Sequence, residues 1–337
     1  APIKYFTPAD GPRTGLEFDP AETLNLVTAT AQSAIGAADI SPDEITGIGV
    51  TSQRQGLVLL NLEGLPIYAG PSRDMRATAE GVEIDANALV DIWELTGHGP
   101  GIRTGWARLK WFAANKPEIY ERTRTMCSIA DWLVLELTGE LLMEETLAVE
   151  AGLAMVASGD PSNALAPAFN LADVQLPQTC APGTVVGNIK KSFSSQLGVP
   201  ANTPVVACGP DVQSGLIGFG AQLPNSVGIM SGWSTTCQRV TERPVFDDTR
   251  AMWTGRHVIE NSWVLDGNAG ETGSTYQWLL SLLYGSLDNV EVMKAIDEPL
   301  GKIEPGSNAV TTFLGPSLVH TANDIERTGG FLFPIPV

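Results

Sequence analysis

The sequence predicts an α/β protein with two domains. Its 337 residues are enough for two domains at about 150 residues each. In each half of the chain, short apolar runs typical of buried strands are followed by a helical pattern and then by further strands. This order of elements is typical of α/β domains, and we expect the two domains to meet at a cleft that binds a ligand.

Composition and charge narrow the classes of partner. Hydrophobic residues make up 43% of the chain and charged residues 17%, which is the balance of a folded globular protein. The net charge of -18 would repel nucleic acid and anionic membranes, so we expect neither as a partner. A small anion such as ATP is not excluded, because backbone N–H groups and a bound cation can neutralise phosphates locally.

The cysteine and histidine patterns give no sign of a disulfide framework or a zinc site. The four cysteines lack CxxC spacing, which predicts reduced, mostly buried thiols in a cytoplasmic protein (Cys127, Cys180, Cys208 and Cys237). The three histidines have no paired ligand spacing, so metal ligands stay unassigned. We also find no signal peptide and no apolar run near the roughly 18 residues of a membrane span.

The elements of the first half are predicted from apolar periodicity and helix caps. A helix over 21–38 is expected because Asp19 is a suitable N-cap and Pro20 suits the first helical position. Strands are expected over 1–6, 45–51, 57–61 and 66–68, the last two as a hairpin, and mainly helical structure over 85–142.

The second half is predicted to begin with a strand that leads into a helix. These two elements cover 203–208 and 212–219, and 220–225 is expected to be a turn between domains. Three strands of a new sheet and a helix should follow, over 227–230, 235–240, 262–265 and 273–284. The sequence therefore predicts domains at 1–220 and 221–337.

Asp211 is the first candidate for chemistry. It follows the strand over 203–208, and ligands of α/β proteins usually bind at the carboxyl ends of strands. A carboxylate there could accept the proton of a hydroxyl group, a role worth about 10²–10⁴-fold in rate. The alternative interpretation is that Asp211 only caps the helix that follows.

Two other polar segments and two glycine-rich turns are further candidates. Arg54 and Gln55 follow the strand over 45–51, and guanidinium and amide groups suit a polyhydroxylated ligand, although a solvated turn would look the same. The segment 72–76 is a third polar cluster, which alone would most often be an exposed ion pair. In the second half, the turns 231–235 and 267–273 contain glycines that let backbone approach phosphates, although neither matches a Walker A or GxGxxG motif.

Taken in order, these segments resemble the FGGY carbohydrate kinases, a branch of the actin-like, ribonuclease H-like ATPases. The resemblance covers nearly the whole chain, and its clearest parts are the segments 45–56, 64–76, 130–140, 209–220, 228–235 and 266–279. It implies a two-domain actin-like ATPase fold, with the substrate side and the catalytic base in 1–220 and the nucleotide side in 221–337. It also implies phosphoryl transfer from ATP with Mg²⁺ to a hydroxyl group of a small sugar, ketose or polyol.

The resemblance implies roles for individual residues. Asp211 would be the catalytic base, and Arg54, Gln55 and Asp74 would face the sugar. Four residues would lie on the nucleotide side: Gly232, Ser234, Gly273 and Gln277. The family's first phosphate loop would precede Ala1 and its adenosine-binding part would follow Val337, so we expect this chain alone to be inactive.

Several departures leave alternatives open. Trp233 stands where the family has a small residue, which puts that phosphate contact in doubt. Arg54-Gln55 matches neither the Met-His of xylulose kinases nor the Arg-Glu of glycerol kinases, whereas Asp211-Val212-Gln213 looks closest to the autoinducer-2 kinase branch. A non-catalytic sugar-binding or regulatory protein of the same fold is the rival hypothesis, and a homodimer is left open.

Overall fold

A computed structural model describes residues 2–87, 91–99, 101, 104–162, 166, 171, 174–270, 272–285, 289–313 and 330–334. The chain divides into two compact units, with unit 1 formed by 1–226 and 239–265, and unit 2 by 227–238 and 266–337. Segment 239–265 therefore belongs to the first unit, although the sequence analysis assigned it to the second domain. The predicted boundary near residue 220 stays a prediction.

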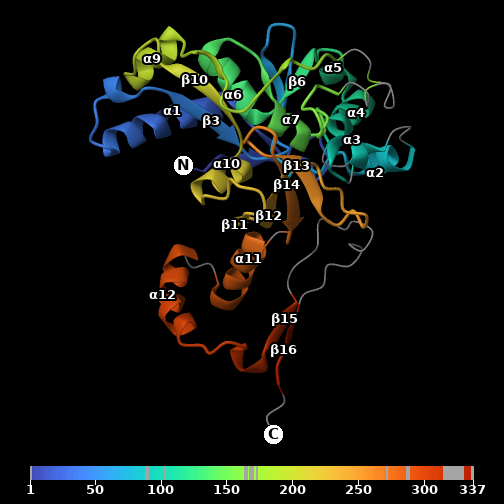
Figure 1. Ribbon diagram of the computed structural model, residues 1–337, viewed down its shortest axis with the longest axis vertical. Coiled ribbons are helices and arrows are strands. Elements are labelled where there is room, and N and C mark those ends of the chain that lie inside the picture. The colour runs from blue at the N-terminus through green and yellow to red at the C-terminus, as the bar shows by residue number, and fades with distance from the viewer. Residues whose placement is uncertain are drawn as a thin grey trace. The chain divides into compact units, whose positions relative to one another are not determined.

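Unit 1 is a mixed α/β unit (Figure 1). Its strands are β1 (Tyr5–Phe6), β2 (Glu17–Phe18), β3 (Ile48–Ser52), β4 (Leu57–Leu60), β5 (Pro66–Gly70), β6 (Thr125–Cys127), β7 (Met143–Glu144), β8 (Thr179–Cys180), β9 (Val185–Asn188), β10 (Pro204–Pro210) and β13 (Trp253–Arg256). Its helices are α1 (Pro20–Ala37), α2 (Thr78–Asn87), α3 (Ile92–Thr96), α4 (Gly105–Asn115), α5 (Pro117–Tyr120), α6 (Ile129–Thr138), α7 (Glu145–Glu150), α9 (Lys191–Leu197) and α10 (Asp211–Gly218), with a 3-10 turn at Pro42–Glu44.

Five further strands and two helices follow α10 along the described part of the chain. They are β11 (Val227–Ser231), β12 (Thr235–Thr241), β14 (Trp263–Asn268), α11 (Thr272–Tyr284) and α12 (Asn289–Gly301), followed by a 3-10 turn at Ser307–Ala309 and the antiparallel pair β15 (Thr311–Phe313) and β16 (Gly330–Leu332). Strands β11, β12, β14 and β13 are hydrogen-bonded in that order. The three strands expected after residue 226 are present, and β13 is an addition that the sequence analysis missed.

Most predicted elements of unit 1 are found close to their expected bounds. The side chain of Asp19 accepts from the backbone N–H of Glu22 and caps α1, whose first residue is Pro20. Strands β4 and β5 form the expected hairpin, and β6 adds to the other edge of β4. Strand β6 lies within 85–142, where mainly helical structure was expected, because its residues complete this sheet and do not continue a helix.

The hydrophobic core of unit 1 surrounds these small sheets. One cluster, centred on Leu57, Trp106 and Met126, packs the β4–β5–β6 sheet against α4. A second cluster, which includes Val50, Val134 and Val205, packs α6 against β3 and β10. Trp106 is completely buried, and large aromatic residues such as this one usually pack the core.

The sheet that positions the site has the strand order β3-β10-β9. β10 runs parallel to β3 and antiparallel to β9. Gly49 of β3 lies so close to Cys208 of β10 that a Cβ atom at residue 49 would stand 2.8 Å from the Cys208 sulfur. A side chain at residue 49 would therefore force the Cys208 sulfur or one of the two strands to move.

We predict that Gly49→Ala lowers the free energy of unfolding by about 1–3 kcal/mol, because the added methyl group overpacks the contact between β3 and β10. Gly47→Ala is the matched control, since its Cβ would stand 3.8 Å from Pro204 and needs no rearrangement. Urea unfolding followed by tryptophan fluorescence measures both variants. Equal stability of the two variants would contradict the prediction.

Candidate active site

The parallel pairing of β3 with β10 brings two candidate segments to one edge of the sheet. Ile48 pairs with Val205 at one end, and Ser52 pairs with Pro210 at the other. The Thr51 hydroxyl donates to the backbone carbonyl of Gly209 at 2.7 Å, which closes this end of the pair. The turn that carries Arg54 and the helix that carries Asp211 therefore start from neighbouring points.

Gly209 allows the chain to pass from β10 into α10. Its φ of +81° lies in the left-handed region, which side chains other than glycine rarely adopt. A Cβ atom here would also lie 2.7 Å from Val258 and 2.8 Å from the Thr146 hydroxyl. The turn before Asp211 is thus held between β10 and the start of α7.

Asp211 is the first residue of α10, and its side chain is exposed. Pro210 occupies the N-cap position, so Asp211 is not the N-cap that the alternative interpretation supposed. Its Oδ1 accepts from the backbone N–H of Val212 at 2.8 Å. Desolvation by the surrounding protein raises the pKa of Asp211, while the charge of Arg54 lowers it and the charge of Glu150 raises it further.

Arg54 is tied to a buried carboxylate that the sequence analysis did not select. Its Nη1 lies 3.4 Å from Oε2 of Glu150, and Nε2 of His98 lies 3.1 Å from the same oxygen. Oε1 of Glu150 accepts from Nε2 of Gln213 at 2.6 Å. Burial acts to raise the pKa of Glu150, but the charges of Arg54 and His98 outweigh it and lower that pKa to about 2.

Gln55 and Asp74 belong to a second buried polar network. Gln55 has a φ of +61°, and its backbone carbonyl accepts from Nη2 of Arg108. Arg108 also donates to the Tyr68 hydroxyl at 3.4 Å, and that hydroxyl donates to Asp74. The two neighbouring residues 54 and 55 therefore connect to different networks.

The carboxylate of Asp74 is occupied by protein groups. It accepts from Nε of Arg76, at 2.7 Å for Oδ2 and 3.0 Å for Oδ1, and from the backbone N–H of Leu16. Asp74 is 1% exposed, and the guanidinium of Arg76 also lies against the ring of Trp111. These contacts give Asp74 a structural role, and its contact with a sugar stays a prediction.

In unit 2 the two glycine-rich turns lie side by side. The backbone N–H of Gly273 donates to the carbonyl of Trp233 at 3.0 Å. A Cβ atom at residue 273 would stand 1.9 Å from the carbonyl oxygen of Gly232, so only glycine allows this approach. Three of the four residues predicted on the nucleotide side, Gly232, Ser234 and Gly273, are thus brought together.

Backbone N–H groups at this junction are already bonded within the protein, and several hydroxyl groups lie beside them. The N–H groups of Thr272, Gly273 and Ser274, at the start of α11, all donate to backbone carbonyls. The Thr235 hydroxyl lies 2.6 Å from that of Thr272 and 3.0 Å from that of Ser231. Gln277 is exposed on α11.

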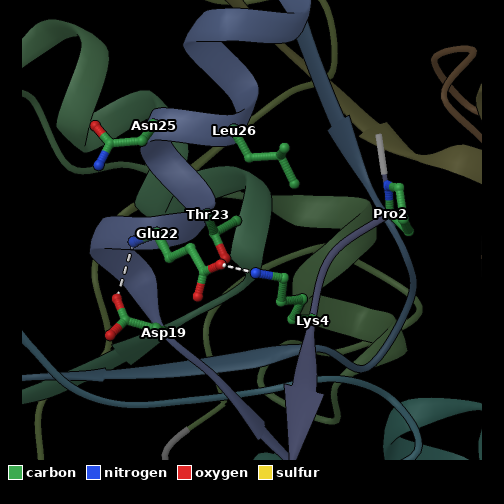
Figure 2. A pocket seen from close by; sticks show the side chains of 7 residues that line it. All are labelled: Pro2, Lys4, Asp19, Glu22, Thr23, Asn25 and Leu26. Atoms are coloured by element: carbon green, nitrogen blue, oxygen red, sulfur yellow. Dashed lines mark hydrogen bonds and ion pairs between the residues drawn. The ribbon is translucent and has the colours of Figure 1, made fainter.

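The described residues also form a cavity that none of the predicted site residues lines. It has a volume of about 310 Å³ and lies between the N-terminal segment and the start of α1 (Figure 2). Its lining includes Pro2, Lys4, Asp19 and Glu22, with an ion pair of 2.7 Å between Lys4 and Glu22. We do not assign this cavity to the active site.

Two further carboxyl groups are buried beneath the Gly209 turn. Oε2 of Glu144 would lie 3.3 Å from a Cβ atom at Gly209, and it accepts from the backbone N–H of Leu147 at 2.9 Å. Asp131 accepts from the backbone N–H of Glu144 at 2.9 Å. Burial raises the pKa of Asp131 to about 6 and that of Glu144 to about 7, although their hydrogen bonds oppose the rise.

The sequence analysis selected Asp211 and Arg54 but not Glu150, His98 or Trp253, whose ring lies 6.0 Å from the guanidinium carbon of Arg54. A signal existed for Glu150, because it is a single charge within the apolar run Leu147-Ala148-Val149-Glu150-Ala151. Charged residues are seldom fully buried without a partner, so such a position indicates a buried ion pair. The sequence contained no corresponding sign for His98 or Trp253.

The raised pKa values of Asp131 and Glu144 predict how the free energy of unfolding depends on pH. A carboxyl group whose pKa is higher in the folded than in the unfolded protein keeps its proton on folding between the two pKa values. The free energy of unfolding therefore falls as pH rises through this interval, here from about pH 4 to about pH 7. Urea unfolding at several pH values measures the slope.

We expect Glu144→Gln to reduce this slope, because glutamine cannot ionise. It should also lower the free energy of unfolding at acidic pH by about 1–3 kcal/mol, since one acceptor oxygen is replaced by an amide. Glu140→Gln, at an exposed position, is the control and should keep the wild-type slope. A wild-type slope in Glu144→Gln would show that folding does not raise the pKa of Glu144.

The chain is similar to known sugar kinases. It is 31% identical over 296 residues to a protein of Bacillus subtilis (strain 168) named as a sugar kinase, YoaC, and 29% identical over 304 residues to the autoinducer-2 kinase of Escherichia coli (strain K12). These matches cover 87% of this chain but 58% and 57% of the two relatives, so the chain spans less than two thirds of their length.

The fold matches that of a solved kinase. The structure of xylulose kinase from Rhodospirillum rubrum superposes with a TM-score of 0.80 at 21% identity, covering 98% of this chain and 67% of that protein. The actin-like ATPase fold expected from the sequence is thereby confirmed. Residues 5–218 match the N-terminal domain of the FGGY family of carbohydrate kinases. The chain therefore belongs to the FGGY family of carbohydrate kinases.

Proposed function

We propose that this chain provides the substrate-binding part and the catalytic base of an ATP-dependent kinase, which phosphorylates a hydroxyl group of a small sugar, ketose or polyol. For a chain of this family, one observation of the structure supports the proposal most directly. The parallel pairing of β3 with β10 brings the Arg54 turn and Asp211 to the same edge of a buried sheet. Ligand sites of α/β proteins usually lie at such an edge.

Asp211 has the properties required of the base. Its exposed carboxylate can approach a substrate hydroxyl and accept the proton when the oxygen attacks phosphorus. Its raised pKa makes the ionised form a stronger proton acceptor than an ordinary aspartate. The carboxylate must be ionised to act, so activity should be lost as pH falls through this pKa.

Arg54 and Gln55 are proposed to orient the substrate. The Arg54 guanidinium is largely buried and is held by Glu150, so little conformational entropy would be lost when a sugar hydroxyl binds it. Gln55 is 5% exposed, and its turn is held by the bond from Arg108 to its carbonyl. Asp74 is proposed to support this turn through Tyr68 and Arg108, beside its predicted contact with the sugar.

The nucleotide side is proposed to use the junction of Gly232, Ser234 and Gly273, with Gln277 farther along α11. ATP would supply the transferred phosphoryl group and Mg²⁺ would neutralise its charge. The hydroxyl groups of Ser231, Thr235 and Thr272 bond to one another at this junction, and they are proposed to donate to phosphate oxygens when ATP binds. No residue of this chain is assigned as a Mg²⁺ ligand.

A short hydroxylated ketone such as autoinducer-2 is a second candidate for the substrate. Two observations favour it: the 29% identity to an autoinducer-2 kinase, and the sequence Asp211-Val212-Gln213. Neither distinguishes it from ketoses or polyols. We further propose that the protein has no nucleic-acid or membrane partner, because of its net charge of -18, and that it is cytoplasmic, because its four cysteines lack the spacing of a disulfide framework. None of the described helices is long and apolar enough to cross a bilayer.

We predict that Asp211→Asn lowers kcat by about 10²–10⁴-fold, because the amide cannot accept the proton. The full-length protein is assayed for ADP release with Mg-ATP and a panel of xylulose, ribulose, glycerol, gluconate and autoinducer-2. Asp43→Asn, at an exposed position in the 3-10 turn of unit 1, is the control and should retain activity.

Two outcomes would count against this proposal. Unchanged turnover in Asp211→Asn would remove Asp211 as the base. A wild-type protein that binds a sugar in calorimetry, but neither binds Mg-ATP nor transfers phosphate, would support the non-catalytic alternative.

A further inference from the structure

Glu150 lies at the centre of the buried network beside the proposed substrate turn. It is the last residue of α7, and its side chain is 1% exposed. Its Oε1 accepts from Gln213, two residues beyond Asp211 in α10, at 2.6 Å. Its Oε2 faces Arg54 at 3.4 Å and His98 at 3.1 Å. One carboxylate thus contacts both the substrate turn and the helix of the base.

The remaining sides of Glu150 are also covered by protein. A Cβ atom at Gly255 of β13 would lie 2.8 Å from Oε1, so the backbone of this strand packs directly on the carboxylate. The neighbouring Trp253 ring lies 6.0 Å from the guanidinium carbon of Arg54 and 5.3 Å from the imidazole ring of His98. Glu150 therefore has no open face toward a substrate, and any effect on the reaction must pass through its neighbours.

The hydrogen bonds of Gln213 make it depend on Glu150. Gln213 is completely buried, and its Oε1 has no hydrogen-bond partner within the described part of the chain. Its Nε2 donates to Glu150. Because a buried amide keeps its orientation through its hydrogen bonds, the bond to Glu150 sets the rotamer of Gln213 in the first turn of α10.

Burial of Glu150 is tolerated only because of these partners. An isolated buried carboxylate would cost several kcal/mol, and the cationic Arg54 and the amide of Gln213 offset this cost. His98 has its Nδ1 2.8 Å from the carbonyl oxygen of Thr96 and its Nε2 3.1 Å from Oε2 of Glu150. Arg54 and Gln213 therefore both direct donor groups toward one acceptor, the carboxylate of Glu150.

We infer that Glu150 is a positioning residue: it fixes the guanidinium of Arg54 and, through Gln213, the first turn of the helix that carries Asp211. This assignment rests on the proposed kinase function for its kinetic consequences. Its structural part, the link between α7 and α10, depends only on the contacts described. The Glu150 side chain would then fix the position of the substrate-binding turn relative to Asp211 without contacting either reactant.

The inference predicts an electrostatic effect as well as a positional one. The charged groups that act on Asp211 are Arg54, from the turn after β3, and Glu150, from α7, with His98 paired to Glu150. Loss of the Glu150 charge would remove a group that raises the pKa of Asp211, and would leave the charge of Arg54 without its counter-ion. Both changes lower the pKa of Asp211.

The decisive variant is Glu150→Gln in the full-length protein, with Glu145→Gln as the matched control in the same helix. Glu145 pairs with Arg256 at 3.0 Å and has no contact with Glu150's partners among the bonds described. For Glu150→Gln we expect kcat to fall by about 10²-fold, the loss that a small misplacement of reacting groups produces. The acidic limb of the kcat/KM profile should also move to lower pH. Glu145→Gln should change neither.

A second variant separates position from charge. Gln213→Met keeps the side-chain length but removes the donor, while the charge of Glu150 remains. It should lower kcat without moving the acidic limb. If Glu150→Gln folds poorly, Gln213→Met still tests the link between Glu150 and α10.

Amide hydrogen exchange of residues 211–218 provides a readout that does not depend on activity. Exchange should become faster in Glu150→Gln and Gln213→Met, but not in Glu145→Gln. Unchanged exchange, or a wild-type kcat and acidic limb in Glu150→Gln, would overturn the inference. If the wild-type protein phosphorylates no compound of the panel, the kinase proposal fails, and hydrogen exchange still decides whether Glu150 holds α10.

Discussion

The parallel pairing of β3 with β10 is the interaction on which the proposed site depends. Side chains that follow two parallel strands start from the same edge of a sheet, so this pairing places Arg54 and Asp211 close together although they are far apart in the chain. The Thr51 hydroxyl closes the end of the pair, and glycines at 49 and 209 permit the close approaches on which it depends. A shift of register here would separate the two groups.

Two buried polar networks surround this edge and meet at the adjacent residues Arg54 and Gln55. The Arg54 side chain extends to Glu150, whereas the carbonyl of Gln55 is held by Arg108 and so connects to Tyr68 and Asp74. Buried polar groups are stable only when their partners are correctly placed, so both networks restrict the conformation of the turn. The positive φ of Gln55 is maintained by these contacts. We regard the turn as preorganised for a hydroxylated ligand.

Charge is distributed unevenly between the surface and this interior. The whole chain carries a net charge of -18, whereas Arg76 and Arg108 are buried and Arg54 is half-buried, and these three are paired with carboxylates or carbonyl groups. Each carboxylate also responds differently to burial. Glu150 lies beside Arg54 and His98 and has a lowered pKa, whereas Asp131 and Glu144 have neutral hydrogen-bond donors and raised pKa values. Asp211 lies between these cases, with one charge of each sign acting on it.

Local patterns in the sequence determined strands β3, β4, β5, β10, β11, β12 and β14, the capped helix α1, and the candidates Asp211, Arg54, Gly232 and Gly273, because apolar runs, caps and glycines act through neighbouring residues. Only the tertiary structure decided that Asp74 is enclosed by Tyr68 and Arg76, that segment 239–265 joins unit 1, and that Glu150 joins Arg54 to Gln213. These features depend on partners from distant parts of the chain. A residue's type and its neighbours in sequence determine which interactions it can make, but the packing of the elements determines which partner it meets.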